Sequence, residues 1–422
     1  MDTVLLGGII ALLLLTAFAG QHGKDTTVLV RQMWAVTLIG VMEAMLLPWP
    51  QRLLLLGILL NVQRIPQPSS QKSFLEQVLA VTGGYLLLRP YLQVTEVESI
   101  LWTVAGIGAG LGIHTLFSFW YVWKYPLLTQ SLDKQPLLYY FQKVLGPLTV
   151  ELGEVRLSPG GYTCGQLMPN WLHAIACLSV AATCGLTITG NVWAWGLMPF
   201  VLVPILATVP CPLTRHFGMA GPVNQCVVHL IVLACAVGII IHPVRGLNAL
   251  AVLAALAAFL AYRQYQAGFP PCVDSGRLDE WYHLMKYWVL LKSYSTYLFG
   301  HGIRSWVVLS NSRSQIQQTP NYFSMAHNEY VQHLFEYGVV GLMALVWYIG
   351  GSLYTAYAVH HGLFLVGMVM ASVALVSFPW AFYHVINFQV KDQQGRVVMM
   401  RSDNYGSPFL FWLSFVLAVI TP

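Results

Sequence analysis

Of the 422 residues, 57% are hydrophobic and only 9% are charged, whereas an ordinary soluble domain has roughly 25% charged residues. A soluble core does not need this much apolar surface, so the composition excludes an ordinary soluble protein and indicates a membrane protein. The net charge of +5 is modest and spread along the chain without a Lys/Arg block, which excludes nucleic acid as an expected partner.

Apolar runs that can cross about 30 Å of hydrocarbon, which takes roughly 20 helical residues, recur along the whole chain. They predict an all-α, polytopic membrane protein with about twelve transmembrane helices, forming a single membrane domain over residues 1–422. The first run lacks the basic residues that open a signal peptide, so we expect it to be retained as a span. The predicted spans lie near 3–20, 31–48, 52–62, 74–90, 99–121, 171–189, 191–209, 223–242, 247–263, 338–358, 362–383 and 408–421.

Four connections between the predicted spans are long, namely 122–170, 210–222, 264–337 and 384–407. Because successive connections of a polytopic helical protein alternate between the two sides of the membrane, all four fall on one face. We expect the functional site on this face, with the largest connection, 264–337, between the ninth and tenth spans. Within the last long connection, the apolar stretches 386–390 and 397–400 flank a polar turn and predict a small hairpin.

The opposite face has only short connections, whose basic residues are Arg52, Arg89 and Arg245. A positive-inside count would therefore put the long connections in the cytoplasm, but the rule weakens for long translocated loops. Charge bias alone does not decide the orientation. Span counting separates Arg245 from Arg215, Arg277 and His327 whichever way up the chain lies, and we interpret Arg245 as a cytosolic anchor.

The seven cysteines contain no Cys-x-x-Cys pair. Four of them lie inside apolar runs, where cysteine usually acts as a small hydrophobic residue: Cys177, Cys184, Cys226 and Cys235. The other three lie in connections, and their pairing does not follow from the sequence: Cys164, Cys211 and Cys272.

The segment 321–342 is the strongest candidate for a functional element. It begins polar, contains His327 and becomes apolar, so we expect a helix that enters the membrane from the face with the long connections. On a continuous helix, His327, Gly338 and Gly341 would share one stripe, and the glycines would allow close packing beneath the histidine. An imidazole at the membrane surface can accept a proton from a hydroxyl. The alternative is that His327 caps or hydrogen-bonds the start of the helix.

This segment resembles the signature of the O-antigen ligase superfamily of lipid-linked glycan transferases. The shared pattern is Ala326-His327-Asn328, then nine residues ending in Glu336-Tyr337, then Gly338-x-x-Gly341-Leu342. Upstream, Arg277 entering an amphipathic helix and the later turn Gly300-His301-Gly302 are similar to further family patterns. The segment 215–224 resembles the family's Arg/Gly/Asn connection more loosely, since Val223 departs from it. The resemblance covers about half of the chain and does not reach the first 170 residues.

The resemblance implies a glycosyltransferase of the bacterial inner membrane whose catalytic loop, 264–337, faces the periplasm. The implied donor is an undecaprenyl-pyrophosphate-linked glycan, with His327 as catalytic base and Arg215 and Arg277 as pyrophosphate-binding residues. It further implies an inverting single displacement that needs no metal or other cofactor. The residues that would support the site are Asn328, Glu329, Gly338 and Gly341. An arginine suits this role because its planar guanidinium donates two parallel hydrogen bonds to a pyrophosphate. The alternative for each arginine is a side chain that snorkels at the membrane interface.

Three acceptors stay open: lipid A-core sugar in a ligase, the growing glycan in an O-antigen polymerase, or a protein hydroxyl in an O-oligosaccharyltransferase. Chain length near 420 residues and the two-arginine pattern favour the ligase. Acidic residues could instead hold a metal, although adjacent acids on a helix point apart; the candidates are Asp274, Asp279 and Glu280. Outside the enzyme class, a lipid or solute transporter would be expected to show an inverted repeat, which the sequence lacks.

Overall fold

The computed structural model describes residues 97–124, 156–158, 161–163, 169–206, 223–268, 277–290, 293–302, 305–306, 309–310, 326–376, 385–391 and 397–403. This part of the chain is helical apart from two small hairpins. In chain order the helices are α5 (Val97–Lys124), α7 (Pro169–Ile188), the 3₁₀ helix η4 (Val192–Leu197), α8 (Met198–Leu206), α10 (Val223–Ile241), α11 (Pro243–Gln266), α12 (Arg277–Leu290), α13 (Tyr294–Phe299), α15 (Glu329–Val359) and α16 (His361–Val376).

Seven of the predicted spans fall on these helices, from 99–121 through 362–383. The seventh span, 191–209, is observed as η4 followed by α8, and the connection 264–337 contains α12 and α13. The first four predicted spans and the last one lie outside the described residues. The prediction of a helical chain is confirmed, and the count of twelve spans stays a prediction.

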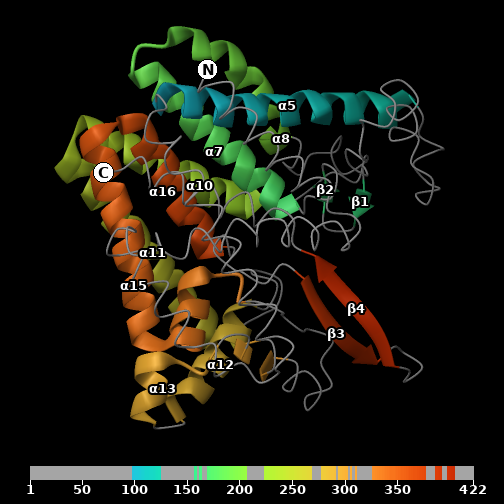
Figure 1. Ribbon diagram of the computed structural model, residues 1–422, viewed down its shortest axis with the longest axis vertical. Coiled ribbons are helices and arrows are strands. Elements are labelled where there is room, and N and C mark those ends of the chain that lie inside the picture. The colour runs from blue at the N-terminus through green and yellow to red at the C-terminus, as the bar shows by residue number, and fades with distance from the viewer. Residues whose placement is uncertain are drawn as a thin grey trace, which may run out of the picture.

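The helices α5, α7, α8, α10 and α16 pack into one bundle, from which α15 extends toward α12 and α13 (Figure 1). The core of the bundle is made of small side chains and satisfied hydroxyls, as is common where helices pack in lipid. The Ser179 hydroxyl of α7 donates to the Val104 carbonyl of α5 over 2.7 Å. A Cβ at Gly185 would meet the Gly362 Cα at 2.5 Å, so α7 and α16 touch backbone to backbone.

Several short connections meet at one end of the bundle. The Asn191 amide, after α7, donates to the Glu98 carboxylate at the start of α5 over 2.9 Å. Burial lowers the pKa of His360, between α15 and α16, while the nearby Glu98 carboxylate opposes this shift. Glu98, Asn191 and His360 therefore share one end, as span counting predicts, and the start of α15 lies at the other.

The outer surface of the helices is apolar. On α11, a helix of 24 residues, the side chains of Val252, Leu256 and Phe259 are 67%, 50% and 56% exposed. A helix face with several exposed apolar side chains is typical of a surface that contacts a membrane. Two described helical segments are long and apolar enough to cross a membrane, Pro243–Arg263 and Glu329–Val359, and the other bundle helices contain shorter apolar stretches of 10–17 residues.

A β-hairpin follows the bundle, where the sequence predicts one. Strands β3 (Val385–Lys391) and β4 (Val397–Asp403) pair antiparallel, with Val390 opposite Val398. Figure 1 shows this hairpin to one side of the helices rather than within the bundle. A second, shorter hairpin pairs β1 (Arg156–Ser158) with β2 (Gly161–Thr163).

Cysteines behave as the sequence predicts. Cys177, Cys226 and Cys235 are buried as free thiols, and Cys184 is half-buried. The Cys177 thiol, in the middle of α7, lies beside the thiol of Cys226, near the start of α10. The direction of α10 follows from the hydrogen bond of 2.8 Å between His229, in its first half, and Ser372, near the end of α16. Because α16 begins beside His360, α10 ends at the end of the bundle that holds His360.

Candidate active site

Helix α15 begins at Glu329, directly after the His327-Asn328 pair. Asn328 is the N-cap residue, and its side-chain oxygen accepts a hydrogen bond of 3.0 Å from the Val331 amide. Asparagine is among the best residues for this role because its side chain satisfies an amide that the first helical turn leaves unpaired. Asn328 therefore caps the helix, so the alternative in which His327 is the cap is not what the structure contains.

The residues on either side of His327 are held in place. The Ala326 amide donates to the Gln332 side chain over 3.2 Å, and the Ala326 carbonyl accepts from the Trp281 indole over 2.6 Å. Together with the Asn328 cap, these bonds fix the turn through which His327 passes. His327 has a φ of 52°, the left-handed conformation that non-glycine residues adopt rarely and often at functional sites. The backbone on both sides of His327 is thus held, which limits where the imidazole can lie.

Helix α12 places Arg277 and Trp281 on the same side, because they lie one helical turn apart. Trp281 is the residue that bonds the Ala326 carbonyl, and Leu284 from the next turn is buried with Ala326 and Phe335 in one apolar cluster. The start of α12 is in this way attached to the start of α15. The attachment brings the first residue of α12, Arg277, to the turn that contains His327.

The electrostatics confirm that Arg277 and His327 are neighbours. Burial, and after it the positive charge of Arg277, lower the pKa of His327 to about 3. The residue as a whole keeps some exposure, while its Nδ1 atom is inaccessible to solvent. The Nε atom of Arg277 is also buried. At neutral pH the site therefore holds an uncharged imidazole beside a permanent cation, a combination that can accept a proton and bind an anion.

The expected stripe of His327, Gly338 and Gly341 on one continuous helix is wrong. His327 precedes the helix, and Gly338 breaks it with a φ of 71°. The turn after α13 inserts at this break: the amides of His301 and Gly302 donate to the carbonyls of Phe335 and Glu336 over 3.0 and 2.9 Å. These carbonyls lose their usual helical partners at the break, and the turn satisfies them.

Two glycines make this insertion possible. Gly300 has a φ of 74°, and a Cβ there would collide with the backbone of Glu336. A Cβ at Gly338 would collide with the carbonyl of Leu298. The sequence predicted that Gly338 permits a close approach, and it does, but the approaching segment is the Gly300-x-Gly302 turn. The two family-like motifs, distant in sequence, thus form one contact beneath the His327 turn.

We expect Gly338→Ala to destabilise the protein strongly. Alanine would have to adopt a left-handed conformation, which costs on the order of 1–3 kcal/mol, and its Cβ would displace the turn after α13. Thermal unfolding of the detergent-solubilised protein measures the effect. Gly350, in the same helix, is the matched control because a Cβ added there would meet no atom within 4 Å, and Gly350→Ala should be neutral or slightly stabilising. Equal effects of the two changes would contradict the structure.

The buried acids near the site have structural partners. Glu329, at the first position of α15, lies 3.4 Å from His333 Nδ1, and the Glu329 carbonyl accepts from the same nitrogen over 3.0 Å. Glu336 is completely buried and accepts from the Trp306 amide over 3.4 Å. Glu329 thus contacts His333, and Glu336 joins the turn after α13 to α15.

The acids weighed as metal ligands point in different directions. On α12, the Asp279 side chain is 37% exposed and pairs with His283 over 3.2 Å, whereas the neighbouring Glu280 is 5% exposed. Adjacent acids on a helix are expected to diverge in this way. No group of three or more His, Cys, Asp or Glu residues that could hold a metal lies within the described ranges. Asp274 lies outside them.

Among the predicted site residues, the structure brings together His327, Arg277 and Asn328, with Gly338 below them and Gly341 one turn further along α15. Arg215 lies outside the described residues, so its place beside Arg277 stays a prediction. Sequence reasoning missed Trp281 and Gln332, which hold the His327 turn. Helical spacing carried a signal for both, since each lies four positions after a residue already singled out, Arg277 and Asn328.

No protein-family model matches the chain, and no curated protein matches it. The resemblance drawn from the motifs therefore stays an expectation, and the closeness of Arg277 to the His327 turn is the observation that bears on function.

Proposed function

We propose that this protein is a multi-pass membrane glycosyltransferase of the bacterial inner membrane, with its active site facing the periplasm. It moves a glycan from an undecaprenyl-pyrophosphate-linked donor to an acceptor hydroxyl, and the acceptor we favour is lipid A-core, as in O-antigen ligation. The observation that carries the proposal is an uncharged His327 imidazole within the electrostatic influence of the permanent cation of Arg277, on the turn to which α12 is attached through Trp281. A base beside an anion-binding group is what this transfer needs.

The reaction is a single displacement at the anomeric carbon of the donor. The acceptor hydroxyl oxygen forms the new glycosidic bond while the bond from the anomeric carbon to the pyrophosphate oxygen breaks. His327 takes the hydroxyl proton, and the electron pair of the broken bond leaves with the lipid pyrophosphate. Arg277, with Arg215 as a proposed second clamp, stabilises the negative charge that develops on the leaving group. Attack opposite the leaving group inverts the anomeric configuration.

Donor binding and base strength are coupled in this arrangement. A base is most effective when its pKa lies near the working pH, and the cation of Arg277 helps burial to hold the pKa of His327 well below that range. A pyrophosphate bound to Arg277 brings negative charge that offsets this cation, so the pKa of His327 rises when the donor is present. The histidine thus becomes a stronger base only in the complex that can react.

The location of the site supports a lipid-linked donor. His327 lies two residues before α15, which is one of the two helices long and apolar enough to cross a membrane among the described residues. A donor whose lipid tail lies in the bilayer would carry its pyrophosphate at such a helix start, where charged groups meet the membrane surface. A soluble nucleotide-sugar donor would not require this location.

The proposal is tested by supplying the purified protein with undecaprenyl-pyrophosphate-linked glycan and one acceptor class at a time. Transfer to lipid A-core supports the ligase, extension of the donor's own glycan supports a polymerase, and modification of a protein supports an O-oligosaccharyltransferase. The glycosidic linkage of the product should be inverted relative to the donor. Failure to transfer to any of the three acceptors would overturn the proposal.

The pH dependence of transfer should change when Arg277 is replaced. The base form of His327 is lost as the pH falls through its pKa, so kcat/KM of the wild type should stay level into the acidic range, because that pKa is about 3. In Arg277→Gln the second cause of the depressed pKa is removed, and the acidic fall of the remaining activity should move to higher pH. Lys286→Gln, on the exposed side of α12, is the control. An unchanged acidic limb in Arg277→Gln would count against the coupling.

A further inference from the structure

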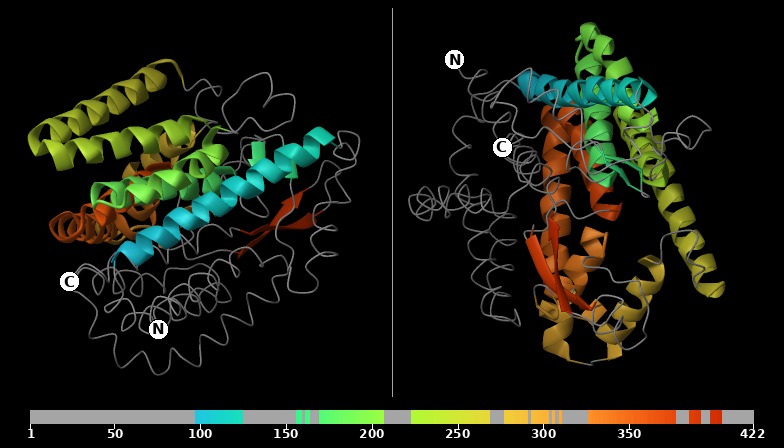
Figure 2. Two further views of the ribbon diagram at one scale, coloured as in Figure 1. Left: turned by 90° about the horizontal axis from the view of Figure 1, so that it is seen from above. Right: turned by 90° about the vertical axis from the view of Figure 1, so that its right-hand side faces the viewer.

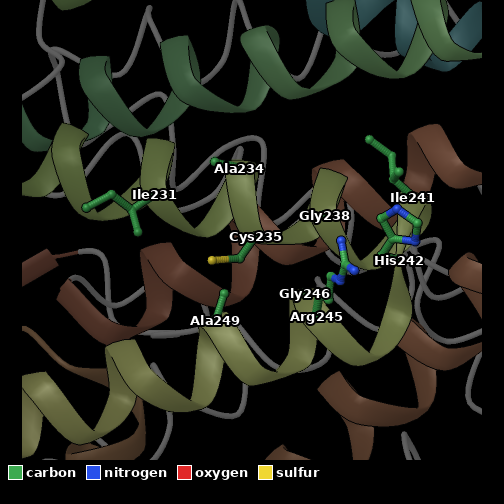
Figure 3. Close-up of a pocket in the computed structure, with 9 residues that line it drawn as sticks. All are labelled: Ile231, Ala234, Cys235, Gly238, Ile241, His242, Arg245, Gly246 and Ala249. Atoms are coloured by element: carbon green, nitrogen blue, oxygen red, sulfur yellow. The ribbon is translucent and has the colours of Figure 1, made fainter.

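A hollow lies between α10 and α11, at the end of the bundle opposite His327. It has a volume of about 470 Å³ and nine lining residues: Ile231, Ala234, Cys235, Gly238, Ile241, His242, Arg245, Gly246 and Ala249. This volume is within the usual range for small-molecule sites, about 300–1,000 Å³. Figure 3 shows the side chains of Arg245 and His242 together at one end of the hollow and those of Ile231 and Cys235 toward the other.

The hollow follows from a tight corner between two helices. The His242 amide donates to the Gly238 carbonyl over 2.8 Å, and the Gly246 amide donates to the His242 carbonyl over 2.9 Å, so α11 starts directly where α10 ends. A Cβ at Gly246 would collide with the backbone of Ile239. Beyond this corner the two helices face each other with small side chains, Ala234 and Ala249, which leave space between them.

The hollow opens toward the surroundings of the protein. Helix α11 lies at the edge of the molecule, packed along α10 and, at its far end, against α12 (Figure 2). Its apolar residues are largely exposed, including Val244 at 72% and Leu247 at 55% next to the hollow. In a membrane these side chains contact lipid chains, so a lipid can enter the hollow from the side.

The two ends of the hollow differ in charge. Arg245 and His242 are both exposed at the corner, and none of the nine lining residues is acidic. The remaining lining residues are apolar or small. An apolar cavity with a cation at its membrane-surface end matches a molecule with an anionic head and a hydrocarbon tail.

We propose that the hollow between α10 and α11 binds one anionic phospholipid, with an acyl chain against Ala234, Cys235 and Ala249 and its phosphate on Arg245 and His242. This site is distinct from the donor site, because the first half of α10 and the start of α15 both bond the last turns of α16, through Ser372 and Ala371. The corner at the end of α10 therefore lies at the other end of the bundle from His327. The proposal assigns Arg245 a ligand, where the sequence suggested only an anchor. It does not depend on glycan transfer.

Binding is measured by native mass spectrometry of the full-length protein, titrated with phosphatidylglycerol or with phosphatidylcholine of the same acyl chains. We expect saturable binding of one phosphatidylglycerol, about fivefold tighter than phosphatidylcholine, the factor that one arginine near an anionic lipid surface contributes. Arg245→Gln should abolish this preference. Ala249→Phe, which fills the hollow, should weaken the binding of both lipids, and thermal unfolding checks that this variant is folded.

Arg263→Gln is the matched control, since Arg263 is an exposed arginine at the other end of the same helix and does not line the hollow. It should leave the preference unchanged. A preference lost equally in the Arg263 and Arg245 variants would overturn the proposal, as a nonspecific attraction. Displacement of the lipid by millimolar inorganic phosphate would also overturn it, because the site would then bind phosphate alone. A third contrary outcome would be that the chain forms dimers which Ala249→Phe disrupts while lipid binding stays unchanged.

Discussion

Replacement of His327 by alanine is expected to lower the rate of glycan transfer by about 10²–10⁴-fold, the usual contribution of a general base. Binding of the lipid-pyrophosphate donor should change little, because the proton transfer contributes in the transition state and not in the ground state. The protein should also remain folded, since Asn328, and not His327, caps α15. Alanine would take the same φ of 52°, a left-handed conformation that histidine already adopts there, so the added backbone cost is small.

The measurement is single-turnover transfer by the purified variant, with donor binding and thermal unfolding measured on the same sample. His283→Ala is the matched control, because His283 is an exposed histidine on α12 that pairs with Asp279 away from the turn. It should retain the wild-type rate. A His327→Ala protein that transfers glycan normally would remove the proposed base, and one that fails to fold would show that His327 acts mainly in structure.

Apolar patterning predicted the helices of the described chain and the final hairpin, because both depend on local periodicity. The geometry of α15 was not predictable from periodicity alone. The segment reads as one helix through Gly338, yet it is broken there because the turn containing Gly300 supplies hydrogen bonds to Phe335 and Glu336. That turn is distant in sequence, and a helical pattern contains no information about a partner that inserts from elsewhere in the chain.

At the candidate site, too, the sequence predicted which residues lie together but not how they are held. Motif spacing and span counting predicted that Arg277 and His327 lie on one face, and the structure places them near enough for the charge of Arg277 to lower the pKa of His327. The way they are held, through the Trp281 indole and the Gln332 amide, was missed because each bond joins a side chain to the backbone of Ala326. Sequence patterns identify residue types, but the backbone group that a side chain meets depends on the fold.

Replacement of Arg277 by lysine is expected to reduce transfer by about 10²-fold, the loss typical when one preorganised donor to a developing anion is removed. Lysine keeps the positive charge, but it cannot present the two parallel N–H groups that a pyrophosphate oxygen pair accepts. The Nε atom of Arg277 is buried at the site, and a flexible ammonium would not reproduce the planar group that it belongs to. Lys286→Gln on the exposed side of α12 should have no effect.

The same measurement in the presence of excess chelator separates two mechanisms. If arginine side chains neutralise the leaving pyrophosphate, their fixed charge takes the role that a divalent ion has in other enzymes, and wild-type transfer should continue at its full rate. If Asp274, Asp279 and Glu280 instead held a metal, chelator would stop the reaction, and Arg277→Lys would have only a mild effect. Asp279 is engaged with His283 and diverges from Glu280, which favours the first outcome. Chelator-sensitive transfer together with a tolerated Arg277→Lys would reverse the assignment of these residues.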